Sequence, residues 1–283
     1  MIQFKIGLCQ LSVTPEKAIN VDNARRSIQF ASKRGAALVV LPEMWNCPYS
    51  TDYFERFAEK FDEKDSTASS LKMLSEVACE ERITIVGGSI PEWSSGGKLY
   101  NTCFVFGPNG DLLAKHRKMH LFDINAPGDI SFNESDTFSA GSSPTIVDTH
   151  VGRIGIGICH DIRFPELAML YRARGAHLIC YPGAFNMSTG EALWELEQRA
   201  RALDNQLFVA TCSPSRDSNG SYQIWGHSTL VNPLGEIIAT SEHDQTIVIA
   251  EVDYSAIQST RESIPILKQR RNDVYQLIDH HTI

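Results

Sequence analysis

The chain has 283 residues, of which 42% are hydrophobic and 21% are charged. This composition is typical of a soluble globular protein with a large core, and the length fits one large domain or two ordinary ones. The net charge of −8 and the lack of any Lys/Arg cluster argue against nucleic-acid binding. No apolar run approaches the length of a membrane span.

The cysteines indicate a reducing compartment. There are seven of them, spread along the chain without any CxxC pair, and an odd number cannot all form disulfides with one another. The first residues alternate between apolar and polar, unlike a signal peptide. We therefore expect a cytoplasmic protein, and a mitochondrial location stays open because some proteins reach organelles by other signals.

The first segments predict a βαβ unit. A strand runs from Phe4 to Leu11, and a helix with one apolar side runs from Asn20 to Lys33. Residues 36–41 form a fully apolar strand that ends at Pro42 and Glu43. Parallel strands of such a unit are buried on both faces, which explains why this strand lacks polar residues.

A helix, a strand, a hairpin and a long loop follow in the middle of the chain. The helix begins at Ser66, and the strand covers residues 83–88. The hairpin joins strands over residues 99–106 and 111–115 through a Gly-Pro-Asn-Gly turn. Residues 124–145 are predicted to be irregular, and a loop of this length in a compact domain is often an active-site lid.

The stretch around Cys159 predicts a strand, a tight turn and a helix. Isoleucines and glycines alternate from Arg153 into Cys159, as in a buried strand. Pro165 suits the first position of a helix, which Gly175 ends. This geometry would present Cys159 as a nucleophile, and the helix N-terminus would favour its thiolate. The alternative is a small core residue, the commoner role of a free cysteine.

The remaining segments complete an α/β pattern with antiparallel hairpins. The predicted elements are a strand over residues 177–181, a helix over 191–205, a strand over 207–211, a hairpin over 226–239 and a strand over 246–252. A partly helical, charged tail begins at about Tyr254. No linker divides the chain, so we expect one domain over residues 1–283, with mixed sheets covered by helices.

Three polar groups in separate segments match the needs of acyl transfer from an amide. Glu43 and Cys159 each follow a strand, and ligand sites in open α/β sheets lie at such carboxyl ends. Lys118 lies in a His-Arg-Lys segment after the first hairpin. A thiol attacks the carbonyl carbon, a carboxylate takes and returns protons, and a cation stabilises the oxyanion. Taken singly, the carboxylate and the ammonium could equally be solvated surface charges.

These segments resemble the nitrilase superfamily of carbon–nitrogen hydrolases, whose triad is Glu-Lys-Cys. The resemblance extends from Lys5 to about Tyr275, and it is strongest to the omega-amidase branch. The segments that carry it are Leu41-Pro-Glu-Met-Trp-Asn-Cys-Pro-Tyr49, Gly87-Gly-Ser-Ile-Pro-Glu92, Leu99-Tyr-Asn-Thr102, Lys115-His-Arg-Lys-Met-His-Leu-Phe-Asp123, Tyr181-Pro-Gly-Ala-Phe-Asn186, Arg201-Ala-Leu-Asp-Asn205 and Gly226-His-Ser-Thr-Leu-Val-Asn-Pro233.

The resemblance implies an α-β-β-α sandwich and a role for each catalytic residue. Glu43 would be the general base and acid, Lys118 the oxyanion stabiliser and Cys159 the nucleophile. Glu134, in a segment that matches the family's loop with a second glutamate, would orient Lys118 or assist proton transfer. The backbone N–H of His160 would complete the oxyanion hole. The branch implies hydrolysis of small dicarboxylic monoamides such as 2-oxoglutaramate and 2-oxosuccinamate to the acid and ammonia, through a thioester.

Substrates of this kind carry a free carboxylate, which needs a charged or hydrogen-bonding partner when buried. Arg163 matches a position where related carbamoylases place a carboxylate-binding arginine. A structural ion pair with Asp161 or Glu166 is an equal alternative for Arg163. The candidate pocket walls are Tyr49, Phe122, Phe185 and Met187.

Several histidines invite other interpretations. His116 and His120 are spaced like a zinc pair, but the first lacks the Glu of an HExxH motif, so we expect two satisfied or exposed histidines. His227 is interpreted as a strand residue rather than the partner of a Cys-His dyad. No metal and no cofactor are expected.

Other functions remain possible from the sequence. Within the superfamily the alternatives are an amidase for deaminated glutathione, a carbamoylase and a true nitrilase. A different class of function is a catalytically silent scaffold that retains the fold. The resemblance also implies a homodimer or a larger even assembly, as superfamily members pair across a symmetric interface.

Overall fold

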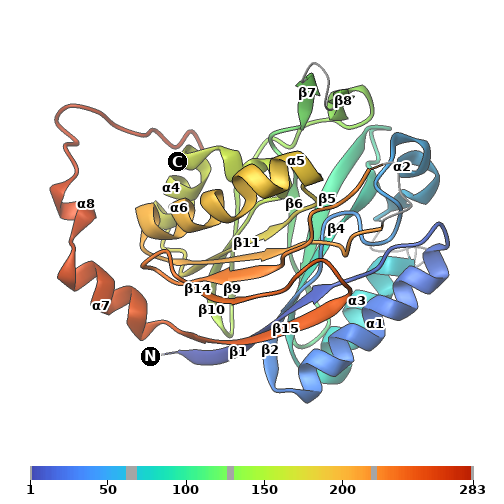
Figure 1. Ribbon diagram of the computed structural model, residues 1–283, viewed down its shortest axis with the longest axis horizontal. Helices are drawn as coiled ribbons and strands as arrows, with labels where there is room; N and C mark the ends of the chain where they lie inside the picture. Colours follow the sequence, from blue (N-terminus) through green and yellow to red (C-terminus); the bar gives the residue numbers. More distant parts are fainter. Residues whose placement is uncertain (1, 62–68, 126–130, 218–221, 282–283) are drawn as a thin grey trace.

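The computed structural model describes residues 2–61, 69–125, 131–217 and 222–281 of the chain (Figure 1). Two large sheets lie face to face, with helices on their outer faces. Within the described segments, no helix has the length and apolar character needed to cross a membrane.

The first sheet contains the predicted βαβ unit. Its strands run in the order β15-β1-β2-β4-β5-β6, and β3 pairs with β4. Strands β1, β2 and β4 are parallel, whereas β15, β5 and β6 are antiparallel to their neighbours. The bounds are β1 Gln3–Gln10, β2 Ala36–Val40, β3 Glu59–Lys60, β4 Thr84–Trp93, β5 Leu99–Phe106, β6 Leu112–Arg117 and β15 Thr246–Asp253.

The second sheet has the order β14-β13-β12-β11-β10-β9. Its central strands β10, β11 and β12 are parallel, and antiparallel strands flank them on both sides. The bounds are β9 Thr145–Thr149, β10 Gly152–Ile156, β11 Leu178–Pro182, β12 Phe208–Cys212, β13 Thr229–Val231 and β14 Ile237–Thr240. Each sheet therefore mixes parallel and antiparallel pairs, as the sequence predicts.

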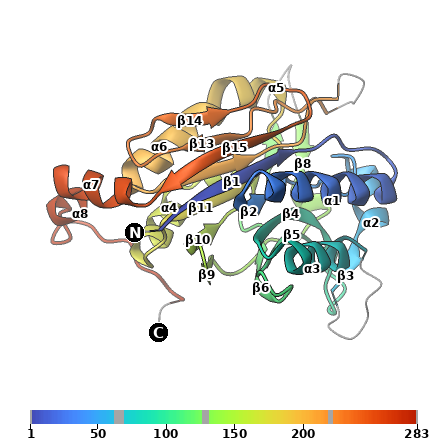
Figure 2. The same ribbon diagram turned by 90° about the horizontal axis from the view of Figure 1, so that it is seen from below.

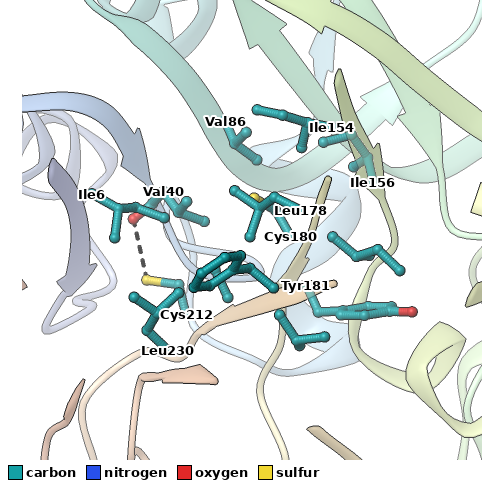
Figure 3. Close-up of a cluster of buried hydrophobic side chains, with 14 of the residues drawn as sticks. Ile6, Val40, Val86, Ile154, Ile156, Leu178, Cys180, Tyr181, Cys212 and Leu230 are labelled. Atoms are coloured by element: carbon teal, nitrogen blue, oxygen red, sulfur yellow. Dashed lines mark hydrogen bonds between the residues drawn. The ribbon is translucent and has the colours of Figure 1, made fainter. Parts of the chain in front are cut away.

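The main core lies between the two sheets. It combines apolar residues of the first sheet, such as Ile6 and Val86, with residues of the second, such as Ile154 and Leu178 (Figure 3). A second cluster lies between the first sheet and the helices α1 (Lys17–Lys33) and α3 (Ser69–Glu81). The helices α4 and α6 cover the other side of the molecule (Figure 2). This α-β-β-α order explains why the central strands are apolar on both faces.

The helices follow the predictions with shifts at their ends. The first helix begins three residues before the expected Asn20, and the predicted start of the next at Ser66 lies outside the described residues. The helix expected over residues 191–205 begins earlier, because α5 and a π-helical turn precede α6. The remaining bounds are α2 Thr51–Phe57, α4 Pro165–Ala173, α5 Met187–Thr189, α6 Glu195–Asn205, α7 Ser255–Ser263 and α8 Ile266–Gln269.

The prediction of an irregular loop over residues 124–145 is wrong at residues 124–125 and 131–136, whereas residues 137–144 contain no helix or strand, as predicted. Two short strands, β7 (Asp123–Asn125) and β8 (Ser131–Asn133), pair as a separate sheet. A 3₁₀ turn follows at Glu134–Asp136, and β9 begins at Thr145. The two strands could not be predicted from the sequence, because the segment is polar and three-residue strands are too short to show alternation. Helix α2 was also missed.

The tail after Tyr254 is partly helical, as predicted, and it returns to the body of the molecule (Figure 1). Near the chain end, the carboxylate of Asp279 accepts hydrogen bonds from two nitrogens of Arg174, which follows α4. This bidentate pair attaches the tail to the helix that follows the Cys159 turn.

Candidate active site

Glu43 lies just beyond the carboxyl end of β2, at the position where a parallel strand presents a side chain to a ligand. Its side chain is completely buried. The next residue, Met44, has a left-handed backbone with φ of 52°. Strand β4 approaches closely at Gly88, where an added Cβ would lie only 2.2 Å from the backbone oxygen of Pro42. The glycine therefore permits the tight chain path around Glu43.

Lys118 follows β6 and points its ammonium between two carboxylates. Its backbone N–H donates to the oxygen of Asn101, which fixes the end of the strand against β5. The ammonium nitrogen lies 3.1 Å from Glu43 Oε1 and 2.7 Å from Glu134 Oε2. All three side chains are at least 99% buried, so water screens these interactions very little.

Asn101 belongs to the same cluster, and sequence reasoning did not assign it a role. Its amide nitrogen donates to Glu43 Oε1 at 2.8 Å and to Glu134 Oε1 at 3.1 Å. It thereby joins the two carboxylates without adding charge. The backbone N–H of Phe122 donates to Glu134 Oε2 at 2.7 Å and completes the hydrogen bonding of that oxygen.

Cys159 lies on a strained turn after β10. Its φ is 48°, in the left-handed region that non-glycine residues rarely occupy, and such strain is typical of functional sites. The turn continues as a short 3₁₀ helix, Cys159–Arg163, and α4 begins only at Pro165. The predicted strand, turn and helix are present, but Cys159 is not at the N-terminus of α4.

The prediction that the helix would favour a thiolate is wrong. Burial and the nearby Glu43 carboxylate raise the pKa of the Cys159 thiol well above its usual range, and Lys118 opposes them only in part. Burial also raises the pKa of Glu43, although Lys118 and a hydrogen bond with the Cys159 thiol act against this. For Lys118, burial favours the neutral amine, but Glu134 and Glu43 outweigh it and raise its pKa. The resting state is a neutral thiol beside an ion pair.

One oxygen of Glu43 remains for the thiol. Oε1 is shared by Lys118 and Asn101, whereas buried Oε2 has no nitrogen or oxygen partner among the described residues. The Cys159 thiol is then the donor available to Oε2, which can accept its proton. The three predicted catalytic side chains therefore meet, although they lie far apart in the sequence.

A cavity of about 280 Å³ opens at Cys159. Phe122, His160, Arg163 and Phe185, four of the predicted site residues, are among those that line it. Residues missed by sequence reasoning complete the wall: Asp123, Ile124, Thr189, Leu193 and Tyr222. Asp123 and Ile124 come from β7, so the small sheet in the supposed loop forms part of the cavity. The pKa of His160 is lowered to about 4, chiefly by burial, so its ring is uncharged at neutral pH.

Two predicted wall residues lie elsewhere. Tyr49 is buried in an aromatic cluster, stacked on Tyr222 with 4.6 Å between ring centroids, and it lines a different cavity. Met187 begins α5, and Thr189 of the same helix lines the cavity instead. Tyr222, on which Tyr49 stacks, lines the cavity with Cys159, and an aromatic residue in a polar loop gives no sequence signal of this role.

The predicted local ion pair of Arg163 is replaced by another. Its Nε lies 3.0 Å from Oε1 of Glu197 on α6, rather than near Asp161 or Glu166. Asp161 instead binds both His116 and His120, so these two histidines are satisfied as predicted. His227 precedes β13 by two residues and is not in a strand. Among the described residues, no three His, Cys, Asp or Glu side chains are grouped to hold a metal ion.

Comparison with known proteins identifies the family. The model of the family "Carbon-nitrogen hydrolase" matches residues 5–262. The chain belongs to the carbon–nitrogen hydrolase family. It is 61% identical over 99% of its length to "Omega-amidase, chloroplastic" of Arabidopsis thaliana, covering 75% of that protein. It is 52% identical over 98% of its length to omega-amidase NIT2-A of Xenopus laevis, covering 98% of that protein.

Solved structures agree with the family assignment. The crystal structure of Saccharomyces cerevisiae Nit3, described as a member of branch 10 of the nitrilase superfamily, superposes with a TM-score of 0.88. The two chains are 43% identical, and the match covers 95% of this hydrolase and 97% of Nit3. The predicted fold and the resemblance to the nitrilase superfamily are confirmed, and this carbon–nitrogen hydrolase is an enzyme of the amidase type.

Proposed function

We propose that this enzyme is an omega-amidase that releases ammonia from the terminal amide of small dicarboxylic monoamides such as 2-oxoglutaramate and 2-oxosuccinamate. The observation that carries the proposal is that the buried Glu43 contacts both Lys118 and Cys159, while Cys159 also lines a small cavity. The names of relatives that match nearly the whole chain support the omega-amidase branch.

The first half of the reaction forms a thioester. Glu43 takes the proton of the Cys159 thiol as the sulfur attacks the amide carbon, because the high pKa of the thiol leaves no standing thiolate. The carbonyl oxygen becomes an oxyanion, which the Lys118 ammonium and the backbone N–H of His160 stabilise. Glu43 then passes the proton to the amide nitrogen, the C–N bond breaks, and ammonia leaves.

The second half hydrolyses the thioester. Glu43 takes a proton from water, and the resulting hydroxide adds to the thioester carbon while Lys118 again stabilises the oxyanion. The C–S bond breaks, the sulfur recovers the proton from Glu43, and the free acid leaves. Glu134 and Asn101 keep Lys118 and Glu43 in place through both halves, because they bind these two groups directly.

The far carboxylate of the substrate would bind to Arg163. Within the described part of the chain, Arg163 forms an ion pair through Nε with Glu197, which leaves the Nη groups for a substrate. About 41% of its side chain is exposed, and it lines the cavity with Cys159. The aromatic and aliphatic walls and the volume of about 280 Å³ favour a small substrate over a tripeptide derivative. Charge and size together support a short dicarboxylic monoamide.

A substrate panel on the purified enzyme tests the proposal. Ammonia release is measured with 2-oxoglutaramate, 2-oxosuccinamate, deaminated glutathione and an N-carbamoyl amino acid, and Cys159→Ala provides the background. We expect the highest kcat/KM for the two oxo-monoamides. A higher kcat/KM for deaminated glutathione or the carbamoyl compound would reject the omega-amidase assignment, and no turnover of any member would favour the scaffold.

We also propose a homodimer in a reducing compartment. The exposed apolar side chains Leu196 and Leu203 of α6, together with Ile238 of β14, support a self-complementary contact. Analytical ultracentrifugation tests the assembly, and a monomer at micromolar concentration would reject it.

All seven cysteines are free, which supports the cytoplasmic prediction, although one relative is named chloroplastic.

A further inference from the structure

The carboxylate of Asp161 is the centre of a buried hydrogen-bond cluster next to the active site. It is completely buried and lies two residues after Cys159. Oδ2 accepts from the backbone N–H of Ile158 at 2.9 Å and lies 3.0 Å from His116 Nε2. Oδ1 accepts from the backbone N–H groups of Met119 and His120 at 3.2 and 3.0 Å, and lies 2.7 Å from His120 Nδ1.

These five donors come from the two segments that carry the reacting groups. Ile158 directly precedes Cys159, whereas His116, Met119 and His120 surround Lys118 on both sides. Apart from Ile158, every donor lies more than 40 residues from Asp161 in the sequence. One carboxylate therefore joins the turn that holds the nucleophile to the strand end that holds the ammonium.

The cluster is charged and rigid. Burial acts to raise the pKa of Asp161, but the hydrogen bonds from His116 and His120 outweigh it and hold the pKa well below its usual range. An ionised carboxylate only accepts, so His116 Nε2 and His120 Nδ1 both carry protons. Neither ring can easily turn, because His116 Nδ1 also contacts Thr145 and the ring of His120 stacks on Phe164.

We propose that Asp161 is a positioning residue that sets the distance between the Cys159 sulfur and the Lys118 ammonium. Asp161 does not contact the substrate or the reacting atoms, and it acts through the two backbone segments that it joins. Since the reacting atoms must align closely, a shift of about 1 Å between these segments would cost roughly 100-fold in rate. This inference rests on the proposed function in one respect, because the turnover assay uses the substrate that the proposed function assigns.

Asp161→Asn is the sharpest test, because it keeps the size and removes the charge. The side chain of Asn has only one oxygen, whereas both carboxylate oxygens of Asp161 accept hydrogen bonds from N–H groups. The NH₂ group of the new Asn side chain would therefore face N–H donors at one of these two positions. The conflict would displace the Cys159 turn from Lys118, and we expect kcat to fall about 100-fold with little change in KM. Glu92→Gln is the matched control. Glu92 is also buried, and it forms ion pairs with Lys115 and Arg117, which lie on β6 on either side of His116.

A histidine pair adds a test by rescue. The amide nitrogen of Asn can occupy the place of a histidine Nδ1, so His120→Asn preserves the donor, whereas His120→Leu removes it. We expect His120→Asn to keep a kcat within about threefold of the wild type and His120→Leu to lose about tenfold, the value of one charge-assisted hydrogen bond. Equal loss in both variants would contradict the role of this hydrogen bond.

Alkylation of Cys159 separates this proposal from the choice of substrate. The rate of modification by iodoacetamide is read at the Cys159 peptide by mass spectrometry, because Cys79 is exposed and also reacts. We expect slow alkylation in Asp161→Asn and a wild-type rate in Glu92→Gln. Should the folded Asp161→Asn protein keep the wild-type kcat and alkylation rate, or Glu92→Gln lose as much, the proposal would be overturned.

Discussion

At the scale of single residues, the resting charge state follows from burial. The Cys159 thiol is buried beside the Glu43 carboxylate, and both burial and this neighbour disfavour a thiolate at Cys159. A neutral thiol is therefore the stable form, and the proton must move when the sulfur attacks. This differs from thiol enzymes in which a cation maintains a standing thiolate.

The pH dependence of activity follows from the same charges. Burial raises the pKa of Glu43, and the carboxylate form is the base, so kcat/KM should rise with pH through that raised pKa and then level off. Lys118 stays charged because its pKa is raised too. The measurement is kcat/KM at pH values between the ordinary pKa values of a carboxyl and a lysine. A second rise near the ordinary thiol pKa would indicate a reactive thiolate and contradict the account.

The proposed role of Arg163 predicts a selective effect on substrate binding. Arg163→Met should raise KM about 10- to 100-fold, the value of one charged hydrogen bond or bidentate pair, with little change in kcat. The matched control is a monoamide of similar size that lacks the terminal carboxylate. Equal losses on both substrates would show that Arg163 acts through Glu197 and the structure of α6.

At the scale of elements, close contact between strands β10 and β11 shapes the turn before Cys159. A Cβ added at Gly157 would lie 2.4 Å from Cε1 of Tyr181, whose ring is completely buried. We predict that Gly157→Ala destabilises the protein by about 1–3 kcal/mol, as overpacked cores do, and lowers activity by moving Cys159.

Gly96→Ala is the control for this substitution. Gly96 is exposed, and the nearest atom to its added Cβ is Ser94 Oγ at 3.9 Å. Urea unfolding should give a free energy of unfolding within about 0.5 kcal/mol of the wild type for Gly96→Ala. An unchanged free energy in Gly157→Ala would show that the turn tolerates a larger residue.

The elements that could be predicted are those with strong local patterns. The apolar strand before Glu43 and the Ile-Gly alternation before Cys159 identify their strands without any tertiary information. The strands β7 and β8 could not be predicted, because three-residue strands have no detectable period. Asn101 and Tyr222 gave no local signal either, since their roles depend on partners that are distant in sequence. The catalytic roles themselves came from family resemblance and stay predictions.

At the scale of the whole molecule, the shared core predicts joint unfolding. Residues of both sheets form one apolar cluster, which supports the single domain expected over residues 1–283. Trp45 packs in the cluster between the first sheet and helices α1 and α3, whereas Trp194 belongs to the cluster that both sheets share. In Trp45→Phe and in Trp194→Phe, tryptophan fluorescence and far-UV circular dichroism should give coincident urea midpoints. Two separate transitions would indicate two domains.

The central claim is that amide hydrolysis proceeds through a covalent bond to Cys159. The most direct measurement is rapid acid quenching of the enzyme during turnover of 2-oxoglutaramate, followed by mass spectrometry of the intact protein and of its peptides. The account predicts an acyl group on the Cys159 peptide of the wild type, and neither adduct nor ammonia release in Cys159→Ala. Ammonia release by folded Cys159→Ala at the wild-type rate would contradict it.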